Sequence, residues 1–217
     1  MKSLLRIHLN ATPPQVERLR ALQQGFSQVC NALAPLVQRT RIWNRVALHH
    51  MAYRDLRQQF PEMGSQMVCN AIYSVSRSCR LVFQSPDSPF NLERLGSRAL
   101  PLLRFHEDAP VYFDRHTLSL KNHQLSMFTL DGRMHFALTL RPPDVEALKT
   151  HKLREVVLVR NGEGFDLVFQ LENPTEDDAG APVPADASEL SDTSEPAVAI
   201  DPASPIPDYV EVEEITP

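Results

Sequence analysis

Positively charged side chains are the residues of this sequence best suited to a shared chemical task. Lys and Arg bind phosphate oxygens, and such contacts give affinity and orientation without reading base sequence. Ten of them are candidate phosphate contacts: Lys2, Arg6, Arg39, Arg41, Arg54, Arg57, Arg77, Arg80, Lys121 and Arg133. Taken singly, each is explained equally well as a solvated surface charge.

A second set of side chains is suited to contact bases. Gln66, Asn70 and Ser74 recur every four residues, which places them on one face of a predicted helix. Their amide and hydroxyl groups can hydrogen-bond base edges, although ordinary exposed polar residues have the same pattern. Trp43 and Tyr53 can stack on bases, and for Tyr53 we favour a place in the core.

Catalytic and metal-binding patterns are not evident. His49 and His50 are adjacent, but no carboxylate or further His lies at ligand spacing on the same helix. Cys30, Cys69 and Cys79 form no Cys-x-x-Cys pair, and we interpret them as reduced thiols, with Cys79 on a buried helix face. The sequence therefore predicts no catalytic residue, no metal and no cofactor.

Charge divides the 217 residues into a basic body and an acidic tail. Residues 173–217 hold 12 of the 27 acidic residues and no Lys or Arg, so residues 1–172 hold 22 basic against 15 acidic residues. A basic body is typical of a nucleic-acid-binding protein, although this surplus is modest. No segment has the roughly 20 apolar residues of a membrane span, and the first residues lack the apolar run of a signal peptide. We therefore expect no membrane partner and a cytoplasmic, nucleoid-associated location.

Alternation of apolar and polar residues predicts β-strands in the second half of the body. Asp131-Gly132 separates two such runs and is a strong hairpin signal, because glycine tolerates the positive φ of a tight turn. Together the strands suffice for a small antiparallel barrel. They are predicted at 4–9, 110–114, 117–121, 124–130, 133–140, 156–160 and 165–172, the last two joined by a turn at 161–164.

Helical periodicity fills most of the chain between the first two of these strands. A first helix begins at Thr12-Pro13 and is expected to kink or end at Pro35; a second runs from about 43 to 59. A third begins with Ser65 as its cap, and a short one opens at Pro142. The third helix is expected to bury Met67, Ala71, Ile72, Val75, Cys79 and Val82, and to turn Gln66, Asn70, Ser74, Arg77 and Arg80 away from the core.

The predicted fold class is α+β in three parts. Residues 1–10 and 110–172 form the barrel, residues 11–109 a helical insertion after its first strand, and residues 173–217 a disordered acidic tail. The tail contains eight of the 18 prolines and few large apolar residues, so it cannot bury enough surface to offset its ordering entropy.

Four stretches of the body carry a family resemblance. They are LNATPPQVERL (9–19), YRDLRQQFPEMGSQMVCNAI (53–72), VYFDRHTLSLK (111–121) with TLDGR (129–133), and the final hairpin before Glu172. In this order they resemble motifs in the N-terminal half of TnpB, the RNA-guided nuclease family of insertion sequences that is ancestral to compact type V CRISPR effectors. The resemblance spans residues 1–172.

This resemblance implies a wedge barrel with an inserted helical recognition lobe that grips a guide RNA scaffold and reads a short duplex motif. The family's catalytic half, a RuvC-like nuclease with three Mg²⁺-binding carboxylates and a zinc ribbon, has no counterpart here. VAIDP (198–202) resembles the first RuvC strand faintly, so Asp201 is a candidate vestige. The alternative, one Asp among the acids of the tail, is favoured.

Three functions follow as expectations. The first is a nuclease-free protein that binds guide-type RNA, double-stranded DNA or both. The second is a truncated or split RNA-guided endonuclease whose nuclease half is lost or belongs to a partner chain, such as a separate nuclease or another CRISPR or transposon protein. The third is a protein-interaction adaptor whose acidic tail mimics nucleic acid.

Overall fold

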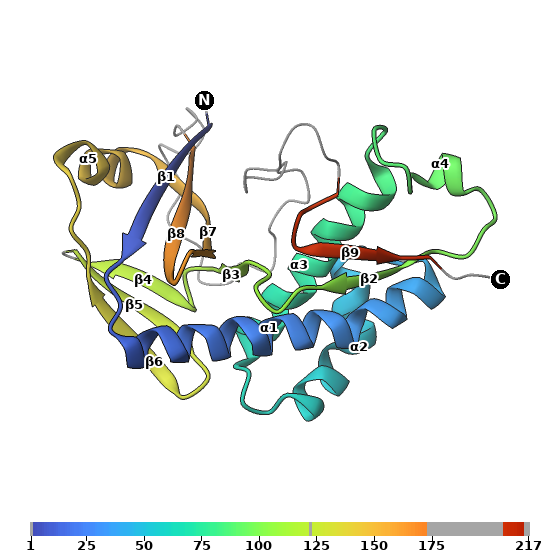
Figure 1. Cartoon of the computed structure of the whole chain (residues 1–217), viewed down its shortest axis with the longest axis horizontal. Helices are drawn as coiled ribbons and strands as arrows, with labels where there is room; N and C mark the ends of the chain where they lie inside the picture. The colour runs from blue at the N-terminus through green and yellow to red at the C-terminus, as the bar shows by residue number, and fades with distance from the viewer. Residues whose placement is uncertain (1, 122, 173–205, 215–217) are drawn as a thin grey trace.

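Most helices lie on one side of the molecule and most β-strands on the other (Figure 1). The computed structural model describes residues 2–121, 123–172 and 206–214. Within these residues the strands form one four-stranded, one three-stranded and one two-stranded sheet, and all pairings are antiparallel. The α+β class is confirmed.

The four-stranded sheet joins the start of the chain to the end of the body. Its order is β1-β8-β7-β3, and Leu9 of β1 is paired with Phe165 of β8. The β7–β8 turn closes at Asn161 and Gly164, as the sequence predicted. The strands are β1 (Lys2–Leu9), β3 (Val111–Phe113), β7 (Lys152–Asn161) and β8 (Gly164–Glu172).

The three-stranded sheet is a meander of β4 (Leu118–Lys121), β5 (Gln124–Thr129) and β6 (Gly132–Ala137). Alternate side chains of β5 are buried, as its period-2 pattern predicted. The Asp131-Gly132 hairpin is confirmed: Thr129 pairs with Gly132, whose φ of 115° requires glycine. The two larger sheets share one apolar core, but their hydrogen-bonded ladders are separate, so the pairing does not show a closed barrel.

The helical side contains α1 (Pro13–Thr40), α2 (Arg45–Gln59) and α3 (Ser65–Gln84), with α4 (Leu92–Leu95) as one short turn. Contrary to expectation, Pro35 does not end α1. An internal proline costs a helix about 3 kcal/mol. Leu33, Ala34 and Val37 beside it are buried, and their packing offsets that cost.

Helix α3 lies at the centre, packed against α1 and α2 on one side and β3 on the other. The six apolar residues predicted for its buried face are all buried. Its N-cap is Gly64 rather than Ser65, and a Cβ on Gly64 would lie 2.8 Å from the Phe128 ring of β5. Near the β7 end of the molecule, α5 (Pro142–Thr150) is the predicted short helix.

A two-stranded sheet is the part of the fold that the sequence prediction missed. It pairs β2 (Leu102–Phe105), from a stretch in which no strand was predicted, with β9 (Val210–Glu213), from the segment predicted as disordered tail. The tail prediction is therefore wrong for 206–214, while the rest of 173–217, with Asp201, lies outside the described residues. No helix of the described chain is long and apolar enough to span a membrane.

Candidate nucleic-acid interface

The polar face of α3 points into the protein, which corrects the prediction that it faces nucleic acid. Asn70 and Ser74 are buried. The Asn70 amide donates to the Tyr112 carbonyl oxygen over 3.1 Å, and the half-buried Gln66 amide donates to the Asp114 carboxylate. Because β3 covers this face, these side chains are not available to read base edges.

Arg77 is likewise internal, with 4% of its surface exposed. Its Nη1 atom lies 2.8 Å from Glu155 Oε2 of β7, and its guanidinium carbon lies 5.3 Å from the Tyr112 ring centroid. Burial alone lowers the pKa of Arg77, but the neighbouring Tyr112 and Glu155 raise it above its ordinary value overall. Arg77 is therefore a structural cation, and its predicted contact with phosphate is wrong.

The aromatic candidates belong to the core or its edge. Trp43 is buried, with its ring centroid 5.5 Å from that of Phe83, so it is not available to stack on a base. Tyr53 packs against the core, as favoured, and stacks on His49 with centroids 4.6 Å apart. Partial burial lowers the pKa of His49, with smaller contributions from the charges of His50 and Arg45.

No group of three or more potential metal ligands occurs among the residues that the structure describes. All three cysteines are free, and Cys79 is buried as predicted. Burial raises the pKa of the Cys30 thiol to about 12, so this thiol stays protonated and unreactive at neutral pH.

Several predicted phosphate contacts are distributed over the strand side of the molecule. Arg6 is exposed, and its Nη1 atom lies 3.5 Å from Asp166 Oδ2. Lys121 is exposed at the end of β4, and the exposed Arg133 donates to the His116 carbonyl oxygen over 2.7 Å. Lys2 pairs in register with Glu172. These residues come from three different strands rather than from one surface feature.

The remaining predicted cations lie on the helical side. Arg54 is exposed on α2, whereas Arg57 is half-buried and its guanidinium donates to the Met63 carbonyl oxygen. Arg80 is half-buried near the end of α3. Arg39 and Arg41 are both exposed where α1 ends, and Arg41 adopts a left-handed backbone with φ 57°.

Near Arg41 lie two arginines, Arg94 and Arg98, that were not among the predicted phosphate contacts. The Arg41 guanidinium donates to the carbonyl oxygens of Arg98 (2.9 Å) and Gly96 (3.4 Å). The Arg98 guanidinium donates to the Arg94 carbonyl oxygen over 2.9 Å. We refer to the exposed residues Arg39, Arg41, Arg94 and Arg98 as the arginine cluster.

Backbone carbonyl oxygens orient three members of the arginine cluster, Arg41, Arg94 and Arg98, and no carboxylate of the described residues neutralises its charge. Its recorded hydrogen bonds go to backbone carbonyls, and no ion pair to any of its members is found within the described residues. A guanidinium has five N–H donors, so donors remain for a phosphate after one or two bonds to carbonyls. Arg94 and Arg98 stand four residues apart, which was a usable signal, but no predicted element placed them beside α1.

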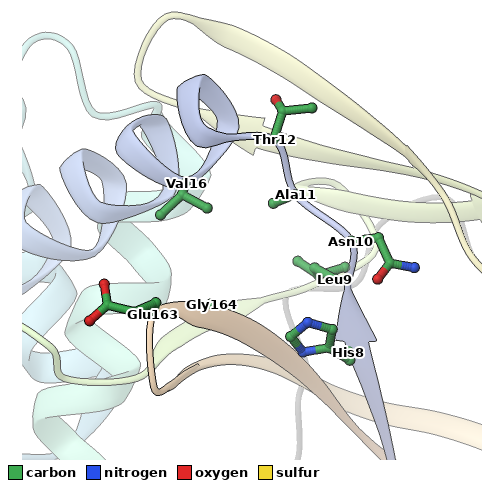
Figure 2. Close-up of a pocket in the computed structure, with 8 residues that line it drawn as sticks. All are labelled: His8, Leu9, Asn10, Ala11, Thr12, Val16, Glu163 and Gly164. Atoms are coloured by element: carbon green, nitrogen blue, oxygen red, sulfur yellow. The ribbon is translucent and has the colours of Figure 1, made fainter.

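A separate open pocket of about 430 Å³ lies between the end of β1, the start of α1 and the β7–β8 turn (Figure 2). His8 and Glu163 are on its rim, and Thr12 lies at the start of α1 (Figure 2). The His8 Nδ1 atom is 2.8 Å from Oδ1 of the buried Asp166, which also accepts from the Asn161 amide. This contact fixes the imidazole through Nδ1 and leaves Nε2 for a ligand. His8 and Asp166 face each other in register across β1 and β8, which their separation in sequence conceals.

Known proteins do not add to these observations. Comparison of the sequence with protein-family models and with curated proteins finds no match. The features of this protein that bear on its function are therefore the arginine cluster, the pocket and the arrangement of the strands.

Proposed function

We propose that this protein binds structured RNA or duplex DNA mainly through phosphate and has no nuclease activity of its own. The observation that carries the proposal is the arginine cluster: four exposed guanidinium groups, two where α1 ends and two in or just after α4, with no carboxylate partner among the described residues. Three of them, on Arg41, Arg94 and Arg98, are held by backbone carbonyl oxygens. Guanidinium groups bind phosphate through two parallel hydrogen bonds, which makes arginine the preferred residue for such a surface.

The order of elements supports the finer proposal of a wedge-like barrel that carries a recognition lobe. β1 leaves the four-stranded sheet, helices α1 to α3 follow, and the chain then returns to complete the sheet with β3, β7 and β8. The TnpB-like motifs fall on these elements, so a guide-type RNA is the first nucleic acid to test. In this proposal the arginine cluster and Arg54 bind phosphate on the lobe, and His8 contributes on the strand side.

One observation favours a second function, the protein-interaction adaptor. The acidic segment 206–214 lies on the basic body, and its Glu213 pairs with Arg104 over 2.5 Å. If the tail replaces nucleic acid, the full chain binds none above background, and neutralising Glu211, Glu213 and Glu214 restores binding. A split nuclease is supported by no contact in the described residues.

The test compares two variants that remove the same charge. R39Q/R41Q/R94Q/R98Q changes the arginine cluster, and the control R115Q/R141Q/K149Q/R160Q changes exposed cations of the strand side that are not candidate phosphate contacts. Binding of a labelled structured RNA and a labelled duplex is measured by anisotropy across a salt series. Each lost contact with duplex phosphate is expected to reduce the slope of log K against log salt by about 0.9.

The proposal predicts at least a tenfold loss of affinity and a flatter salt dependence for the cluster variant, with near wild-type values for the control. Equal losses in both variants would show diffuse attraction and remove the cluster as a site. The absence of any nucleic-acid binding at low salt would overturn the proposal. Circular dichroism of both variants checks that each one is folded.

A further inference from the structure

β9 reaches its position across a long connection. Residues 173–209, 37 in number, separate it from β8, and among the described strands it pairs with β2 alone. Figure 1 shows β9 beside β2 on the helical side, away from β8. A segment that adds to the edge of another strand in this way has the geometry of a peptide bound by β-augmentation.

β2 is held in place without β9. Asn31 of α1 donates to the Phe105 carbonyl oxygen over 2.9 Å and accepts from the Phe105 N–H over 2.8 Å. Ser27 donates to the same carbonyl oxygen, and Gln38 donates to that of Leu100. Polar side chains along α1 thus bind one edge of β2, as a neighbouring strand would, and its other edge remains for a partner strand.

The contacts of segment 206–214 alternate between apolar and acidic. Tyr209 and Val210 are buried, whereas Glu211 is exposed opposite Arg104 in register. Glu213 forms the ion pair with Arg104. The Tyr209 carbonyl oxygen accepts from the His106 N–H over 3.0 Å, which aligns the segment before the pairing begins.

The Tyr209 side chain supplies a specific anchor. Its phenol lies close enough to Tyr112 and Arg77 to contribute to the raised pKa of both groups. The Tyr112 hydroxyl and Arg77 Nη2 are buried and lack a hydrogen-bond partner of good geometry within the described chain. Such atoms are costly to bury. We refer to these two polar groups, at the junction of α3 and β3, as the socket of Tyr112 and Arg77. The Tyr209 side chain packs beside this socket.

We propose that the outer edge of β2, with Arg104 and the socket of Tyr112 and Arg77, is a docking site for an extended acidic segment of a partner protein, and that residues 206–214 occupy it in cis. The fitting pattern is Tyr-Val-acidic-Val-acidic, as in the resident segment. A covalent connection of this length gives an effective concentration of about a millimolar. A partner segment that binds β2 weakly therefore cannot displace residues 206–214, and a successful partner has to bind this edge more tightly than they do.

The experiment uses the full chain, folded before it is cut. A protease recognition sequence is placed within residues 173–205, the purified protein is cleaved, and the released fragment is removed by gel filtration. A fluorescein-labelled peptide of residues 206–214 is then titrated into cut and uncut protein. Cleavage abolishes the tether, so we expect saturable binding with an apparent Kd at least tenfold lower for the cut protein.

Substitutions in the peptide test the contacts without disturbing the fold of the protein. Tyr209→Ala and Glu213→Lys are expected to weaken binding at least tenfold. Glu214→Gln is the control, because Glu214 is exposed and lies beyond the paired residues.

Three outcomes would overturn the proposal. If the cut protein unfolds, or keeps its fragment for a day without exchanging it for labelled peptide, β9 is an integral strand. If cut and uncut proteins bind the peptide equally, the peptide binds elsewhere. If the uncut chain forms concentration-dependent dimers that take up no peptide, the occupant is a second copy of the chain.

Discussion

Arg77 of α3 and Glu155 of β7 form a buried ion pair that fastens the helical side of the protein to the four-stranded sheet. The Arg77 Nη1 atom lies 2.8 and 3.1 Å from the two carboxylate oxygens of Glu155, and both side chains are at most 10% exposed. Loss of one partner leaves a buried charge without compensation, at a cost of about 3–5 kcal/mol.

Arg77→Met is therefore expected to lower the free energy of unfolding by about 3–5 kcal/mol. Urea titration measures the change, and R77M/E155L is expected to recover much of it because no charge remains buried. Arg54→Met is the control, since an exposed side chain contributes within about 0.5 kcal/mol. A stable R77M protein with weakened nucleic-acid binding would instead restore Arg77 as a phosphate contact.

Gly64→Ala is expected to destabilise the protein by about 1–3 kcal/mol, because overpacked sites have costs of this order. The added Cβ would lie 2.8 and 2.9 Å from two ring atoms of Phe128. F128L removes those atoms, so G64A should cost less in that background. Gly25→Ala, where the nearest atom is the flexible end of Met63 at 3.3 Å, is the matched control. Equal effects of the two alanines in thermal unfolding would refute the clash.

Alkaline pH should unfold the protein through its buried phenols. Burial raises the pKa of Tyr73 to about 12, and it raises the pKa of Tyr112 well above the ordinary value of 10. The unfolded chain releases these protons first, so stability is complete below pH 10 and declines as the pH rises from 10 towards 12. Urea unfolding at pH 8, 10 and 11 measures the decline. Tyrosinate absorbance that titrates fully near pH 10 in the folded protein would contradict it.

Mg²⁺ should support no cleavage by the pure protein. The described residues bring together no group of three His, Cys, Asp or Glu side chains that could hold a metal ion, and catalysis with two metals needs several carboxylates. Labelled DNA and RNA are expected to stay intact in Mg²⁺, and EDTA should leave their binding unchanged. Cleavage that is lost in Asp201→Ala would refute this prediction and favour the truncated nuclease.

Local patterns predicted the strands and hairpins because their causes are local. Alternation placed β5 and β6, and Asp131-Gly132 placed the turn between them. The apolar face of α3 was predicted for the same reason. Its polar face was misassigned because the partners of Asn70 and Arg77 lie on β3 and β7. The periodicity of a helix shows which residues share a face, but it does not show which distant strand packs against that face.

Distant pairings explain the other errors. The alternation of Val210 and Val212 with Glu211 and Glu213 is a strand signal, but the proline-rich and acidic composition around it favoured disorder. The arginine cluster was half predicted, because Arg39 and Arg41 were candidate phosphate contacts while Arg94 and Arg98 approach them only through the fold. The N-cap of α3 lies one residue before the predicted Ser65, at Gly64, where the Phe128 ring leaves room only for glycine.

The pairing of β1 with β8 also has a consequence for biosynthesis. β1 leaves the ribosome before β8, which begins about 155 residues later, and at ordinary rates of synthesis this interval is roughly 8–30 s. Helices α1 to α3 can form in that interval, while β1 has no partner strand. Nascent chains arrested before Gly164 should therefore expose β1 to proteases and chaperones, and chains arrested well after Glu172 should protect it.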